Sequence, residues 1–128
     1  MDESNKKRIL VVDDEVAITR MLKLNLEQTN QYVVRTENVA TAAVAAAEEF
    51  HPDLAILDVM MPELDGGKLA SLFQEHPKLR KVPIVFLTAA ATKREVASHG
   101  GTIGGMPFLA KPVSLPEVLG CLKNQLAP

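Results

Sequence analysis

The sequence predicts an α/β fold in which a doubly wound, five-stranded parallel sheet carries five helices on its two faces. Short apolar runs rich in β-branched residues alternate with segments whose apolar residues recur at the spacing of a helical face. The apolar runs are continuous, which is typical of strands buried on both faces of a parallel sheet. The length of 128 residues fits one hydrophobic core, so we expect a single domain over residues 1–128 with its core at about residues 8–126.

The first third of the chain shows the alternation clearly. Residues 8–13 form an apolar run that ends in an acid, residues 17–26 have apolar side chains at helical spacing, and residues 32–35 form a second run. Asn38 is a favourable N-cap residue before an alanine-rich segment, so we predict a helix over residues 39–50. The side chains expected to face inward on this helix are Val39, Ala43, Ala46, Ala47 and Phe50.

The middle of the chain repeats the pattern. Residues 54–57 predict a third strand that runs into Asp58. A loop with proline and glycine follows, and then a helix through residues 69–73. Residues 83–87 predict a fourth strand, which ends at Thr88.

The chain after the fourth strand is rich in glycine. We predict a short fourth helix over residues 92–98 and a fifth strand over residues 108–110, with glycines at positions 100, 101, 104 and 105 between them. Ser114 and Glu117 match an S-x-x-E capping box, which predicts the start of the last helix. That helix is expected to bury Leu115, Val118, Leu119, Leu122 and Leu126.

Composition excludes several classes of function. The formal net charge is −2 and acids and bases are mixed along the chain, so we expect no direct contact with nucleic acid. The single cysteine, Cys121, excludes an internal disulfide and a cysteine-based metal cluster. There is no apolar run of about 18 residues, and the polar N-terminus lacks the features of a signal peptide. We therefore expect no membrane segment and a cytoplasmic location.

Side chains that could take part in chemistry stand at the ends of four predicted strands. Asp13 and Asp14 end the first, Asp58 the third, Thr88 the fourth and Lys111 the fifth. Ligands of such sheets bind beyond the carboxyl ends of the strands, so we expect these side chains to converge. Carboxylates about 4 Å apart repel by roughly 4 kcal/mol per pair, and an oxygen-only cluster favours a hard cation, above all Mg²⁺. A lysine and a hydroxyl beside Mg²⁺ suit phosphoryl transfer, for which a carboxylate is a competent nucleophile.

Each of these residues also has an ordinary structural interpretation. Asp13 and Asp14 could cap the first helix, Thr88 could simply end a strand, and Lys111 could be a solvated lysine. Asp58 is harder to explain in this way, because an unpaired carboxylate near a buried edge is costly. Their joint occurrence at strand ends favours the functional interpretation.

Four motifs resemble those of a known family. They are LVVDDE at residues 10–15, DVMMPELDG at residues 58–66, VFLTA at residues 85–89 and FLAKP at residues 108–112. Their order and spacing resemble the receiver domain of bacterial two-component response regulators over nearly the whole chain. The resemblance implies a flavodoxin-like fold with strand order 2-1-3-4-5, and phosphotransfer from a sensor histidine kinase or a phosphotransfer protein. We expect a monomer or a phosphorylation-dependent dimer.

The resemblance also implies a role for each residue of the site. Asp58 matches the phosphoacceptor, Asp14 the direct Mg²⁺ ligand, and Asp13 the ligand that acts largely through water. The carbonyl oxygen of Met60, together with Asp58, would complete the protein's share of the metal shell. Lys111 matches the lysine that pairs with the phosphate.

A second group of positions matches the switch of the family. Thr88 matches the hydroxyl that moves toward the phosphoryl group, Phe108 the aromatic side chain whose rotamer follows it, and Lys111–Pro112 a cis peptide bond. The segment 98–106 departs from the family, because glycines stand where a continuous helix and an Ala-Gly-Ala-like turn are usual. We therefore expect a mobile connection there, and the output partner stays open.

Two other functions remain open from the sequence. An Mg²⁺-dependent phosphohydrolase that forms an aspartyl-phosphate also needs acids and a lysine at strand ends, although such enzymes usually carry a second acid where this chain has Met60. A pseudo-receiver would serve only as a scaffold. We expect instead a regulator, not an enzyme, that assists its own phosphorylation and dephosphorylation. The sequence decides neither whether the chain acts alone or within a longer protein, nor which kinase and target it serves.

Overall fold

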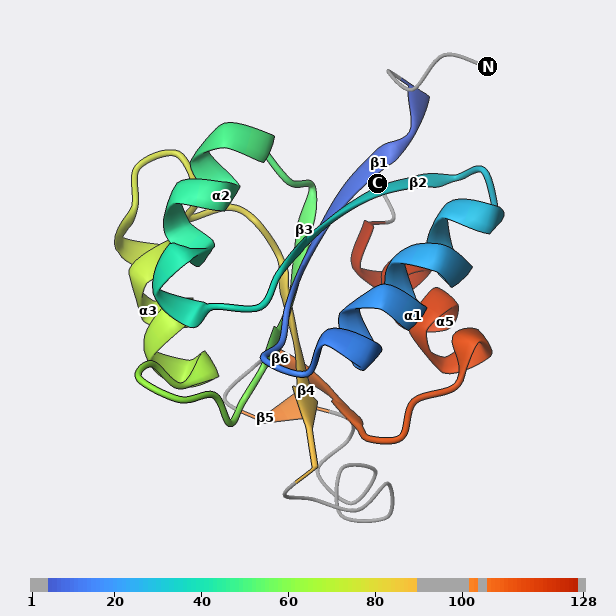
Figure 1. Cartoon of the computed structure of the whole chain (residues 1–128). Helices are drawn as coiled ribbons and strands as arrows, with labels where there is room; N and C mark the ends of the chain where they lie inside the picture. The colour runs from blue at the N-terminus through green and yellow to red at the C-terminus, as the bar shows by residue number, and fades with distance from the viewer. Residues whose placement is uncertain (1–4, 90–101, 104–105, 127–128) are drawn as a thin grey trace.

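Strands and helices alternate in the computed structural model, which describes residues 5–89, 102–103 and 106–126 (Figure 1). The strands are β1 (Lys7–Val12), β2 (Tyr32–Glu37), β3 (Leu54–Asp58), β4 (Ile84–Thr88), β5 (Thr102–Ile103) and β6 (Met106–Ala110). The described helices are α1 (Val16–Gln28), the short 3₁₀ helix η2 (Ala40–Ala42), α2 (Ala43–Phe50), α3 (Gly66–Glu75) and α5 (Leu115–Leu126). The predicted fourth helix, over residues 92–98, and much of the glycine-rich segment 98–106 lie outside the described residues.

Five parallel strands lie in the order β2-β1-β3-β4-β6, which confirms the predicted doubly wound topology. β5 adds an antiparallel strand beside β6, where the sequence predicted only a glycine-rich connection. This strand has two residues, too few to show an alternating pattern in the sequence. The winding reverses between β1 and β3, and ligands of such folds bind at the carboxyl ends of these strands.

The sheet separates two hydrophobic clusters. Helices α2 and α3 cover one face, and α1 and α5 cover the other (Figure 1). Successive residues of β1 serve opposite clusters, because Leu10 and Val12 pack with α2 and α3 whereas Ile9 and Val11 pack with α1 and α5. All four side chains are fully buried. Burial on both faces explains why the strands are continuously apolar.

Both edges of the sheet are partly covered. On β2, the Lys23 ammonium donates to the Val34 carbonyl oxygen over 2.8 Å, and Glu27 Oε2 accepts from the Val34 N–H over 3.0 Å. At the other edge, β5 pairs with β6. These contacts occupy backbone groups that would otherwise be available to another chain.

Helix starts were predicted with mixed success. Ser114 and Glu117 form the predicted capping box, through hydrogen bonds of 3.0 and 3.3 Å between backbone and side chain. The prediction that Asn38 caps the second helix is wrong, because α2 begins at Ala43 and the Asn38 amide bonds to the loop after β1. Val39 is 52% exposed and does not face inward. Among the described helices, none is both long and apolar enough to cross a membrane.

Candidate functional site

The polar strand ends meet at one edge of the sheet. Asp58 is the last residue of β3, Thr88 is the last of β4, and Lys111 directly follows β6. The Lys111 N–H donates to the Thr88 carbonyl oxygen over 2.8 Å, which fixes the end of β6 beside that of β4. Asp13 continues β1, because its N–H donates to the Glu37 carbonyl oxygen over 3.1 Å.

Side-chain hydrogen bonds hold the loop between β1 and α1. Asp13 Oδ1 accepts from the Glu15 N–H over 2.9 Å, which closes a tight turn. The Asn38 amide donates to the Asp13 carbonyl oxygen over 2.7 Å and to Thr19 Oγ1 over 2.9 Å. The N-cap residue of α1 is Glu15, so neither Asp13 nor Asp14 occupies the capping position. The acids of this loop are thus available for another role.

Lys111 lies at the centre of an ion-pair cluster. Its Nζ is 2.8 Å from Glu15 Oε1, 2.9 Å from Asp13 Oδ2 and 3.4 Å from Asp58 Oδ1. The side chains of Asp13 and Asp58 are 0% and 4% exposed, whereas that of Glu15 is 58% exposed. Removing the ammonium would leave two buried carboxylates without a counter-charge, which is strongly unfavourable.

The surroundings shift the pKa of both central groups upward. Burial, followed by the charge of Asp13, raises the pKa of Asp58 from 3.8 to about 6, although Lys111 acts in the opposite direction. Burial alone would lower the pKa of Lys111, but the nearby carboxylates of Glu15, Asp13 and Asp58 outweigh this effect and raise it. At pH 7 the site therefore places a poorly stabilised carboxylate next to a firmly protonated ammonium.

Three carboxylates are close enough to share a cation. Oxygen atoms of Asp13, Asp14 and Asp58 all lie within 4.8 Å of one another. Asp13 Oδ2 is buried and accepts no hydrogen bond of good geometry, despite its 2.9 Å contact with Lys111 Nζ. Hard divalent cations prefer oxygen-only ligands, and Mg²⁺ usually takes one or two carboxylates and keeps several waters. The donor set and the unsatisfied oxygen both fit Mg²⁺.

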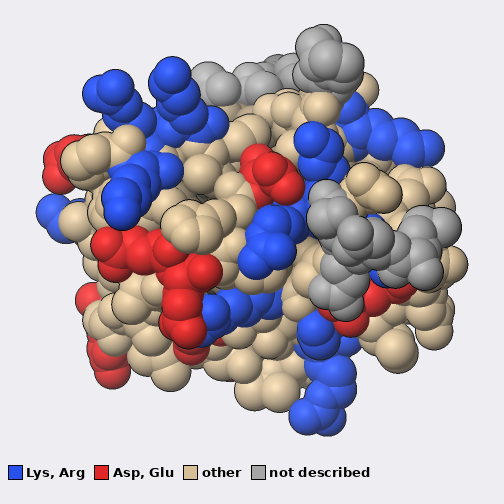
Figure 2. All heavy atoms as spheres, turned by 90° about the horizontal axis from the view of Figure 1, so that it is seen from above, with Lys and Arg blue, Asp and Glu red and all other residues tan. Residues whose placement is uncertain are grey.

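Charged side chains of both signs lie at the end of the sheet at which the strands begin. Figure 2 views this end, where lysine and arginine side chains lie among aspartates and glutamates. Exposed cations near this end include Lys7 at the start of β1 and Lys78, Arg80 and Lys81 before β4. The acidic cluster of Asp13, Asp14 and Asp58 lies at the opposite end, where its own negative charge favours a cation.

Gly66 allows α3 to begin directly against the strand that carries Asp58. A Cβ at this position would overlap the Asp58 carbonyl oxygen and would lie 2.9 Å from Val59 Cα. The Gly66 N–H donates to the Val59 carbonyl oxygen over 2.9 Å, and Asp65 caps the helix by accepting from the Lys68 N–H over 2.8 Å. The motif after Asp58 thus fixes the loop that borders the site.

Comparison with known proteins identifies the family. The sequence matches the response regulator receiver domain over residues 9–123. The chain belongs to this family. ResD, a transcriptional regulatory protein of Bacillus subtilis, is 38% identical over 121 residues, which are 93% of this chain and 48% of ResD.

Two further relatives match over nearly their full length. DivK, a polar-differentiation response regulator of Brucella ovis, is 27% identical over 122 residues, which are 94% of this chain and 96% of DivK. The structure of the chemotaxis response regulator CheY4 of Vibrio cholerae has a TM-score of 0.79 and 29% identity, and the match covers 94% of this chain and 99% of CheY4. The chain spans about half the length of ResD and of other transcriptional regulators that match it.

The positions predicted to form the switch lie beside the site. Thr88 is 3% exposed at the end of β4. The partly buried Phe108 ring packs against Phe86, with ring centroids 4.8 Å apart. The Lys111–Pro112 peptide bond is cis, as the sequence predicted. β6 therefore connects the aromatic position directly to the lysine of the site.

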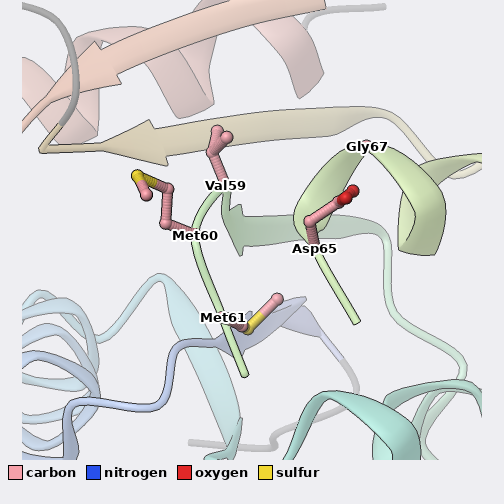
Figure 3. A pocket seen from close by; sticks show the side chains of 5 residues that line it. All are labelled: Val59, Met60, Met61, Asp65 and Gly67. Atoms are coloured by element: carbon pink, nitrogen blue, oxygen red, sulfur yellow. The ribbon is translucent and has the colours of Figure 1, made fainter. Parts of the chain in front are cut away.

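Met60 follows Asp58 by two residues, but its side chain turns outward. The side chain is 65% exposed, whereas a backbone hydrogen bond from Met60 contributes to the environment of Asp58 by lowering its pKa. An open hollow beside this loop (Figure 3) is lined by Val59, Met60, Met61, Asp65 and Gly67. The backbone of Met60, rather than its thioether, thus reaches the acidic cluster.

Sequence reasoning missed two residues that shape the site. Glu15 contacts Lys111, and Asn38 holds the backbone of Asp13. The position of Glu15 directly after two acids was a usable signal for the first. Nothing local distinguished Asn38 from a helix cap, because the same amide suits either role.

Proposed function

We propose that Asp58 is the phosphoacceptor of a Mg²⁺-dependent signalling switch, and that its donor is the phosphohistidine of a sensor histidine kinase or a phosphotransfer protein. The observation that carries this proposal is a buried carboxylate at the end of β3 with the buried Lys111 ammonium 3.4 Å away. Membership of the receiver family supports the same role. We place this exchange in the cytoplasm and expect the chain to be a monomer or a phosphorylation-dependent dimer.

The transfer moves the phosphoryl group from nitrogen to oxygen. An Asp58 carboxylate oxygen attacks phosphorus, a P–O bond forms as the P–N bond breaks, and the histidine nitrogen keeps the electron pair. With a pKa of about 6, roughly nine-tenths of Asp58 is ionised at pH 7, so no separate base is required. This carboxylate is also less stabilised than one in water, which favours its attack.

The neighbouring side chains stabilise charge on the phosphoryl oxygens. The Lys111 ammonium pairs with one of these oxygens, and the Thr88 hydroxyl donates a hydrogen bond to another. When bound, Mg²⁺ supplies further positive charge at these oxygens. Asp13, Asp14, Asp58 and the carbonyl oxygen of Met60 would hold it.

The response to phosphorylation follows from the same placement. We propose that Thr88 turns toward the phosphoryl group and that Phe108, which packs on Phe86, changes rotamer with it. Phe108 has no hydroxyl, so its readout depends on packing rather than on a hydrogen bond. The structural change at β4 and β6 then reaches the surface beside these two strands, and we expect a partner to bind there.

Incubation with acetyl phosphate and Mg²⁺, followed by intact-mass measurement, tests the proposal. We expect the mass of one phosphoryl group in the natural chain, none in Asp58→Asn, and none when EDTA replaces Mg²⁺. Glu63→Gln, which changes an exposed carboxylate near the same end, should accept the group normally. Steady consumption of acetyl phosphate without an adduct would indicate a phosphohydrolase, and no reaction at all would indicate a scaffold. Either result would overturn the proposed role of Asp58.

A further inference from the structure

We propose that Glu15 is a latch that holds Lys111 away from Asp58 until a phosphoryl group arrives. This inference rests on the proposed phosphoacceptor role of Asp58. Three carboxylates surround Lys111 Nζ. That of Asp58, which the lysine assists in the proposed transfer, is the most distant, at 3.4 Å. Glu15 is the nearest, at 2.8 Å, and its contact has the geometry of a hydrogen bond.

Lys111 already has carboxylate partners with which a phosphoryl oxygen would compete. An ammonium group has three N–H donors, and here three carboxylates surround it. Among the described contacts of Lys111 Nζ, only the one with Glu15 is a hydrogen bond, so a phosphoryl oxygen that pairs with Lys111 competes chiefly with Glu15. The carboxylate that leaves most easily decides how strongly the resting site competes with the phosphoryl group.

Glu15 is the contact that can be released. Its side chain is 58% exposed, so water can solvate the carboxylate when the ammonium leaves. Asp13 is fully buried, and its Oδ2 accepts no hydrogen bond of good geometry, so loss of Lys111 there would leave an uncompensated charge. Asp13 therefore retains Lys111 near the acidic cluster, whereas Glu15 competes with the phosphoryl group for the ammonium.

The latch can be measured with beryllofluoride, a mimic of the phosphoryl group on a carboxylate. We would determine its affinity for the full chain by calorimetry in saturating Mg²⁺ for the natural sequence and Glu15→Gln. The variant keeps the length of the side chain and loses the charge. Because exposed ion pairs contribute modestly, we expect beryllofluoride to bind about two- to fivefold more tightly to Glu15→Gln.

A matched control separates the latch from a general charge effect. Glu63 is an exposed carboxylate that borders a small hollow with Asp14, and no described contact joins it to Lys111. In about 0.5 M salt, where screening acts beyond a few ångströms, Glu63→Gln should bind beryllofluoride as the natural chain does. The gain in Glu15→Gln should persist, because its contact is direct.

A third variant tests the reach of the side chain. Glu15→Asp keeps the charge but is one methylene shorter, so its affinity should fall between those of the natural chain and Glu15→Gln. Unchanged or weaker binding in Glu15→Gln, or an equal gain in Glu63→Gln at high salt, would overturn the latch. Failure of the natural chain both to bind beryllofluoride and to accept a phosphoryl group would instead overturn the proposed function. Thermal midpoints within a few degrees of each other would confirm that all variants are folded.

Discussion

Replacing Asp58 by asparagine should stabilise the domain at pH 7 when no divalent cation is present. In the folded chain the pKa of Asp58 is raised from 3.8 to about 6, first by burial and then by Asp13. Between these two values the folded state binds more protons than the unfolded state. Stability therefore falls as the pH rises through this window, and the ionised carboxylate destabilises the fold above it.

The size of the effect follows from the same two values. A pKa raised from 3.8 to about 6 corresponds to roughly 3 kcal/mol, at about 1.4 kcal/mol per pKa unit. Asparagine has nearly the same shape and no charge, so Asp58→Asn avoids this cost. We expect a gain in the free energy of unfolding of about 2–3 kcal/mol at pH 7, and almost none below about pH 4, where the natural side chain is protonated.

Urea unfolding followed by circular dichroism, at both pH values and with EDTA, measures these differences. Glu63→Gln removes an exposed carboxylate and should change stability by less than about 0.5 kcal/mol at either pH. Equal stability of Asp58→Asn and the natural chain at pH 7 would refute the reasoning. So would a gain of the same size at pH 7 and below pH 4.

Three further predictions concern the surroundings of the site. Raising Mg²⁺ from zero to ~10 mM should raise the thermal midpoint of the natural chain, measured by scanning calorimetry, and Asp14→Ala should remove most of that rise. A midpoint that does not change with Mg²⁺ would contradict a metal site. Gly66→Ala should destabilise the domain by about 1–3 kcal/mol in urea unfolding, because its Cβ overlaps the backbone at the end of β3. Gly67→Ala, whose Cβ meets only a side-chain oxygen at 3.4 Å, should be nearly neutral. Asn38→Ala should lower the free energy of unfolding by about 1–3 kcal/mol and weaken Mg²⁺ binding in calorimetry, because the Asp13 carbonyl oxygen and Thr19 Oγ1 lose their donor. An unchanged Mg²⁺ affinity would limit Asn38 to a role in stability.

The sequence predicted the layout of the site because parallel strands share an edge. Once residues 8–13 and 54–57 are read as neighbouring parallel strands, Asp13 and Asp58 must lie near each other, whatever the details of packing. Continuous apolar runs gave the strands, and burial of alternate residues of β1 in opposite clusters shows why these runs contain no polar positions.

Contacts that depend on tertiary structure could not be predicted in the same way. Glu15 and Lys111 are 96 positions apart, and their pairing requires both the loop after β1 and the turn after β6. Asn38 is suited to a helix cap by its chemistry, but the buried acceptors of the neighbouring loop compete for its amide. Val39 is exposed because η2 precedes α2 and changes the direction in which the first residues face. Local propensity was outweighed by contacts between segments.

The charges of the site indicate which side chains can respond to phosphorylation. Asp13, Asp14, Glu15 and Asp58 against Lys111 give four carboxylates and one ammonium, a formal charge of −3. In the proposed mechanism a bound Mg²⁺ brings this to −1, and a phosphoryl group then adds about one further negative charge. Asp13 and Asp58 are too deeply buried to move into water, and in the proposed mechanism Asp14 is a metal ligand. On the latch proposal, the added charge is therefore accommodated by moving the ammonium toward the phosphoryl group and releasing the exposed Glu15 carboxylate to solvent.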